Sequence, residues 1–122
     1  MLAIVDRDLE SARLERLSPD WRFGIAYNAA LKLCTVLLYA SGYRAGRELA
    51  HKRTVESLPL ILGEGRTKDA RYLDGCRIKR HQIEYETAGS ATDVDADELI
   101  DFASALRTDV LVWLRANHPE LA

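Results

Sequence analysis

The stretch from Pro19 to Ser41 constrains the fold of this chain most, because it reads as one long apolar helix. Ser18 before it can cap free backbone amides, and Pro19 has the φ angle that the first helical position needs. Gly42 is expected to end the helix in a left-handed conformation. A long apolar helix needs other elements to cover it, so the sequence predicts a fold packed around this segment.

The same segment is not uniformly apolar, since Arg22, Asn28 and Lys32 interrupt it. A membrane-spanning helix needs about 20 predominantly apolar residues, so we expect a core helix and no membrane association. One face carries small residues that would let another helix approach closely. These are Ala26, Ala29 and Ala30, followed by Leu33.

Hydrophobic periodicity predicts four more helices. They cover residues 2–17, 50–62, 67–88 and 95–117. The most regular apolar face belongs to the last one and consists of Leu99, Phe102, Leu106, Val110 and Trp113. No segment alternates like a strand. The sequence therefore predicts a single all-α domain over residues 1–122, an up-and-down bundle of four or five helices.

Four residues are expected to set the boundaries of these helices. Pro59 should kink the 50–62 segment or divide it into two short pieces. Thr67 is the expected cap of the fourth helix. Asp95, with Glu98 three residues later, is the expected capping box of the last helix.

The composition, 48% apolar and 30% charged with a net charge of −2, is typical of a globular helical protein. The chain therefore lacks the overall excess of basic residues that marks many nucleic-acid-binding proteins. The charges are segregated, however. Residues 66–81 carry six bases and two acids, whereas residues 84–101 carry seven acids and no base. These blocks are either two solvated faces, or a basic patch for an anion beside an acidic edge for a partner.

The cysteines and histidines lack the spacing of metal ligands. Cys34 and Cys76 lie in separate predicted helices without a CxxC or CxxH pattern, and the three histidines form no HxxxH pair. We therefore expect buried free thiols, no metal site and no cofactor. Free thiols and an N-terminus without leader features both indicate a cytoplasmic protein.

The segment from Arg66 to Ala88 carries the least ordinary chemistry in the chain. At helical spacing, its apolar seam is flanked by a polar stripe. The seam holds Leu73, Cys76, Arg80 and Ile83, and the stripe beside it holds Arg77, His81, Glu84 and Tyr85. Such a flank either has a function or is a solvated surface.

Each group of this flank has two interpretations. Arg80 and Glu84 can form an i,i+4 ion pair, or Arg80 can contact an anion such as an RNA phosphate. His81 is a surface residue or a general base with a pKa tuned near neutrality. Tyr85 is an interface or core aromatic, or it stacks on a nucleotide and donates its hydroxyl. Metal-free RNA cleavage needs a base and a cation, which His81 with Arg77 or Arg80 could supply.

Three features together resemble the HEPN family of small all-helical domains. The first is the run YNAALKLCTVLLYA at 27–40, which closes on SGYR at 41–44. The second is His51 at the start of the next helix. The third is the run RIKRHQIEY at 77–85, which looks like the R-x-x-R-N-x-x-x-Y helix of the family. The resemblance covers nearly the whole chain.

The resemblance implies a helical bundle that is commonly a homodimer, often partnered with a minimal nucleotidyltransferase in toxin–antitoxin or defence systems. Several family members are metal-independent ribonucleases, with an Arg, a polar residue, and a His four to six positions after the Arg. Arg80 and His81 match the first two positions. The third falls near Tyr85, Glu86 or Thr87, none of which is His.

From these features we expect a HEPN-like interaction module, dimeric, that associates with RNA, a nucleotide or a nucleotidyltransferase. Its ligand-binding residues would be Arg77, Arg80, His81 and Glu84. The alternative is a metal-independent endoribonuclease with Arg80, His81 and Tyr85 as catalytic residues and Arg77 beside them. A third possibility is a structural helical protein without a ligand.

Overall fold

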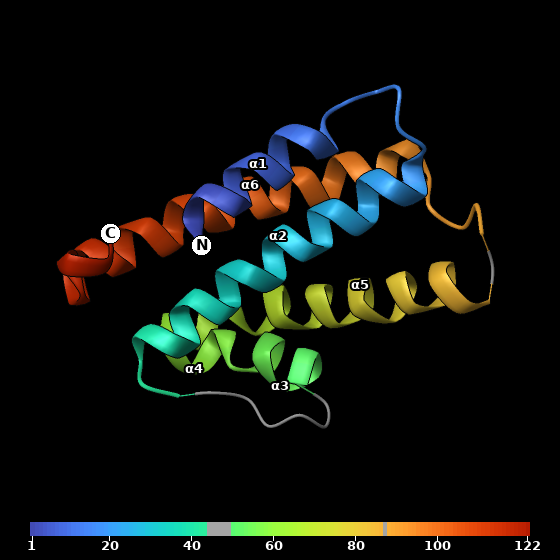
Figure 1. The fold of residues 1–122 in the computed structure, drawn as a ribbon. Helices are drawn as coiled ribbons and strands as arrows, with labels where there is room; N and C mark the ends of the chain where they lie inside the picture. Colours follow the sequence, from blue (N-terminus) through green and yellow to red (C-terminus); the bar gives the residue numbers. More distant parts are fainter. Residues whose placement is uncertain (44–49, 87) are drawn as a thin grey trace.

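The computed structural model describes residues 1–43, 50–86 and 88–122, and every regular element within these ranges is a helix (Figure 1). The α-helices are α1 (Leu2–Ala12), α2 (Pro19–Ala40), α3 (Ala50–Glu56), α4 (Leu58–Leu62), α5 (Thr67–Tyr85) and α6 (Asp93–Asn117). Two 3-10 helices, η1 (Glu64–Arg66) and η2 (Pro119–Leu121), follow α4 and α6. The predicted all-α bundle is confirmed. Thr87 and Arg44, the last residue of the SGYR run, lie outside the described residues, as does most of the link before α3.

α2 is the centre of the bundle. It runs diagonally through Figure 1, with α1 and α6 on one side and α3, α4 and α5 on the other, and it contacts all of them. The long helices α1, α2, α5 and α6 alternate in direction, as short connections require. Ten residues of α2 are buried, among them all four residues of its small-residue stripe. Of the described helices, α2 alone has the length and mean hydropathy, 1.4, that could cross a membrane; here its apolar residues build the core.

The predicted end of the first helix is wrong. α1 stops at Ala12, and the next residues form a turn rather than continuing to Leu17. The reason is a contact from α2, because Nε of Arg22 donates a hydrogen bond to the carbonyl oxygen of Ala12 at 2.8 Å. This bond satisfies a carbonyl that the end of a helix leaves without a partner.

The predicted cap of the last helix is also wrong. α6 begins two residues before Asp95, and its cap is Thr92. The Thr92 hydroxyl accepts from the backbone amide of Asp95 at 3.1 Å, and the Asp95 carboxylate accepts from the backbone amide of Thr92 at 2.9 Å. Asp95 therefore belongs to a capping box, but as its third helical residue and not as its cap.

Other boundaries follow the sequence more closely. The 50–62 segment is divided into two pieces at Ser57, as Pro59 predicted. Gly42 adopts a φ of 86°, the left-handed conformation expected after α2. Thr67 is the first residue of α5 and not its cap, because η1 leads directly into the helix and the Thr67 hydroxyl donates to the carbonyl oxygen of Glu64 at 2.8 Å. α5 ends at Tyr85, three residues before the predicted end.

The two cysteines are free and buried, as predicted. Burial raises the pKa of the Cys34 thiol to about 12 and that of the Cys76 thiol to about 11. Thiols with such pKa values stay protonated near neutral pH, so both behave as apolar core residues.

Candidate functional site

α5 carries the candidate site residues, and the two candidate arginines, Arg77 and Arg80, are each paired within the helix. Nε of Arg77 donates to the carboxylate of Asp74 at 2.8 Å. Nη2 of Arg80 lies 2.9 Å from Oε1 of Glu84. The i,i+4 ion pair that the sequence offered as one interpretation of Arg80 is therefore present. An anion would have to compete with these carboxylates for either guanidinium.

His81 and Tyr85 lie together on an exposed flank of α5. Their ring centroids are 4.7 Å apart with an angle of 42° between the planes. The Tyr85 side chain is 73% exposed, so it is not a core residue. Ile78, which is 46% exposed, lies on the same stripe three residues before His81. We call Ile78, His81 and Tyr85 the α5 flank.

The segregated charges of the sequence meet each other in the fold. Lys79 of α5 lies 3.0 Å from the carboxylate of Asp95 at the start of α6. Arg66 at the start of α5 binds Asp109 of α6 at 2.7 Å and Asp69 at 3.2 Å. The backbone amide of Thr92 and the Lys79 ammonium lower the pKa of Asp95. Four of the six bases of residues 66–81 are thus paired with acids, whereas Lys68 and Arg71 are exposed.

A groove of about 300 Å³ lies between the first half of α2 and the last half of α5. We call it the α2–α5 groove. It is lined by Asp20, Trp21, Gly24, Ile25, Asn28, Arg80, Ile83 and Glu84. Two of the predicted site residues, Arg80 and Glu84, belong to it, whereas His81 and Tyr85 lie outside it. The structure therefore splits the candidate site into a groove and a flank.

Arg80 is held in the groove above a buried tyrosine. Its guanidinium carbon lies 5.7 Å from the ring centroid of Tyr27, which suits a cation–π contact. Nε of Arg80 and the hydroxyl of Tyr27 are both buried without a hydrogen-bond partner among the described residues. Burial raises the pKa of Tyr27 to about 12, although Arg77 and Arg80 partly oppose the rise. This side of the bundle therefore contains polar atoms that the fold leaves unsatisfied.

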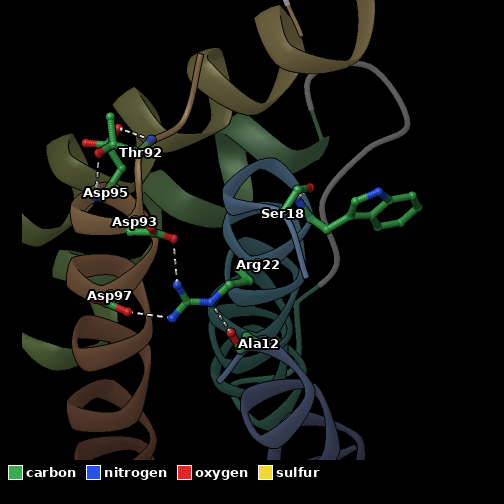
Figure 2. Close-up of polar contacts among 8 residues, drawn as sticks. Ala12, Ser18, Arg22, Thr92, Asp93, Asp95 and Asp97 are labelled. Carbon is green, nitrogen blue, oxygen red and sulfur yellow. Dashed lines mark hydrogen bonds and ion pairs between the residues drawn. The ribbon is translucent and has the colours of Figure 1, made fainter. Parts of the chain in front are cut away.

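Sequence reasoning missed Arg22, the cation with the most hydrogen-bond partners among the described residues (Figure 2). This residue is only 5% exposed, and three residues from two other helices, α1 and α6, bind its side chain. Besides the bond from Nε to Ala12, Nη1 lies 3.2 Å from Asp93 and Nη2 lies 2.5 Å from Asp97. We call this cluster the Arg22 clamp. The only signal of this cluster in the sequence is a base within a largely apolar segment.

Asp20, in the first turn of α2, binds the loop that precedes α6. Its carboxylate accepts from the backbone amides of Gly89 at 2.5 Å and Ala91 at 3.0 Å. The loop before α6 is thereby tied to the first turn of α2, next to the α2–α5 groove. The contacts of the Asp20 carboxylate are thus with a loop about 70 residues away in the sequence.

Of the predicted site residues, Arg80 and Glu84 line the α2–α5 groove, and His81, the candidate base, does not. The described chain also contains no group of three or more His, Cys, Asp or Glu side chains that could hold a metal ion. Comparisons with protein-family models, curated proteins and solved structures find no match for the chain.

Proposed function

We propose that this protein is a HEPN-like helical-bundle interaction module, which acts by binding partners and not as a ribonuclease. The supporting observation is the division of the candidate residues on α5. Phosphodiester cleavage without a metal needs a general base and a charge stabiliser at one phosphate. Arg80 lies in a groove under its Glu84 partner, whereas His81 lies on the exposed α5 flank.

The α5 flank supports the dimer that belongs to this proposal. Ile78, His81 and Tyr85 form an exposed stripe of apolar and aromatic groups, of the kind found at protein contacts. Two copies of one helix stripe can pack around a two-fold axis, the commonest symmetry of soluble oligomers. A protein partner, for which a minimal nucleotidyltransferase is the candidate, suits the module better than RNA because most bases of α5 are already paired.

The cleavage test separates the module from the alternative endoribonuclease. Purified protein is incubated with structured RNA in EDTA, together with the His81→Ala variant and the matched His51→Ala variant, which removes another exposed histidine. We expect intact RNA in all three samples. Cleavage that His81→Ala abolishes and His51→Ala retains would refute the module and establish the ribonuclease.

The assembly test uses light scattering at micromolar concentration. We expect twice the chain mass of 13.7 kDa for the wild type and for Val112→Glu, which places a charge at an exposed position of α6. Tyr85→Glu should give the monomer mass, because a buried unpaired carboxylate would disrupt the flank contact. A wild type at the monomer mass would remove the dimer from the proposal.

A further inference from the structure

We infer that the α2–α5 groove is the docking site for a segment of another protein that inserts one bulky apolar side chain and carries a Lys or Arg beside it. The inference rests on the proposed interaction module and names the chemistry of its partner. It is carried by three properties of the groove: its apolar wall, its excess of negative charge and an unpaired amide.

The apolar wall is exposed where a partner can reach it. Trp21, in the first turn of α2, is 69% exposed, and Ile25 and Ile83 are half-buried behind it. Tryptophan is among the residues in which binding hot spots are enriched. The groove volume of about 300 Å³ is at the small end of ligand pockets, so it suits an inserted side chain better than a large ligand.

The charge of the groove selects a basic occupant over a phosphate. Two carboxylates, Asp20 and Glu84, line it against one guanidinium, Arg80, which is already paired with Glu84. A phosphate would meet this negative field, whereas a Lys or Arg beside the inserted side chain would be attracted by it.

Asn28 supplies a polar contact inside the groove. Its side-chain amide is half-buried and forms no hydrogen bond with the described residues around it. An amide of this kind can donate to and accept from the backbone of an extended or helical segment. An inserted peptide would therefore gain a hydrogen bond that fixes its direction along the groove.

A substitution at Gly24 can fill the groove and so test whether a ligand binds there. A Cβ atom at Gly24 would meet only Nε of Arg80, at 3.7 Å, which is an ordinary contact. Because Gly24 lines the groove, the larger side chain of Gly24→Leu should occupy it. Gly75→Leu is the matched control, because it makes the same change in the interior of α5, outside the groove, where a Cβ meets nothing within 4 Å.

The probe is a displayed library of random 12-residue peptides, selected on the full-length protein and compared with selection on Gly24→Leu. We expect enriched peptides that share a bulky apolar residue next to Lys or Arg. Their affinity, measured by calorimetry, should fall by about tenfold or more in Gly24→Leu and in Trp21→Ala, and by less than about twofold in Gly75→Leu. Glu84→Gln should weaken binding by a smaller factor and reduce its dependence on salt.

Several outcomes would overturn the inference. These are no enrichment over the Gly24→Leu selection, enriched peptides without a base, or affinities that Gly24→Leu leaves unchanged. Binding of AMP or polyuridine that Gly24→Leu abolishes would assign the groove to nucleotides. Dissociation of a wild-type dimer by Gly24→Leu would assign it to a second copy of the chain. None of these results depends on RNA cleavage, so the inference and the proposed module can fail separately.

Discussion

Arg22 and Arg80 lie on either side of α2 and show two different uses of a partly or fully buried cation. Arg22 is 5% exposed, and its guanidinium donates hydrogen bonds to oxygen atoms of α1 and α6. Arg80 has one carboxylate partner, on its own helix, and its Nε has none among the described residues. The first arginine joins three segments of the bundle, whereas the second leaves contacts unfilled at the wall of a groove.

The comparison indicates which cation stabilises the fold and which one lines the groove. The Arg22 clamp lies at the carbonyl end of α1 and the amide end of α6, where a cation and carboxylates respectively suit the helix dipoles. Arg80 gains an intrahelical pair, which contributes a few tenths of a kcal/mol, and a cation–π contact with Tyr27. A change at Arg22 should therefore affect stability, and a change at Arg80 should affect the groove.

The largest expected effect is that of Arg22→Met, which keeps the length of the side chain and removes its bonds. The variant leaves the carbonyl of Ala12 without its donor, but Asp93 and Asp97 are 74% and 62% exposed and stay hydrated. We therefore expect a loss of about 2–3 kcal/mol in the free energy of unfolding, below the cost of stranding a buried charge. Urea denaturation followed by circular dichroism measures it.

The control for this variant is Arg107→Met. Arg107 makes a two-bond contact with Asp6 on the exposed surface between α6 and α1, so its loss should cost less than about 1 kcal/mol. Equal losses in the two variants would show that the clamp is no stronger than a surface ion pair, and the comparison with Arg80 would fail.

A smaller effect is expected from Tyr27→Phe, and it depends on pH. Tyr27 has a pKa of about 12 in the fold and 10.0 in an unfolded chain, so between these values the fold keeps a proton that the unfolded chain releases. The free energy of unfolding is therefore unaffected by the ionisation of this group below pH 10. It decreases by about 2 kcal/mol as the pH rises toward 12. Tyr27→Phe should remove this part of the alkaline loss.

At pH 7 the same variant should be neutral or slightly stabilising. The hydroxyl of Tyr27 has no partner among the described residues, so its removal relieves an unsatisfied buried group instead of breaking a bond. Denaturation curves of both proteins at pH 7, 10 and 11.5 give the comparison. A loss of more than about 1 kcal/mol at pH 7 would show that the hydroxyl is bonded, for example through an ordered water.

Local patterns predicted what local interactions determine. The five helical segments and the Arg80–Glu84 pair follow from periodicity and i,i+4 spacing, and Pro59 correctly predicted a divided third segment. The two carboxylate partners of Arg22, Asp93 and Asp97, lie 71 and 75 residues away in the sequence, so no local pattern could indicate them. The early end of α1 had the same cause, because the donor to its last carbonyl comes from α2.

The candidate site shows the same limit. All of its predicted residues lie on α5, since helical spacing is what the sequence reveals. The groove is formed with residues of α2, such as Trp21 and Gly24, which no motif joined to Arg80. Helical spacing places Arg80 on the apolar seam and His81 and Tyr85 on the stripe beside it, but only the packing of α2 against α5 shows that Glu84 shares the groove with Arg80. The motif thus predicted residues of one helix, but it did not predict which of them line the same groove.

The smallest expected effect on stability is that of Arg80→Met. It removes one intrahelical ion pair and the cation–π contact with Tyr27, and it also removes an Nε that is buried without a partner. These contributions oppose each other, so the free energy of unfolding should change by less than about 1 kcal/mol in urea. The groove would then contain Asp20 and Glu84 without a neighbouring cation, and its preference for basic peptides should increase. A loss as large as that of Arg22→Met would contradict this division, because it would make Arg80 a second structural clamp and not part of a binding surface.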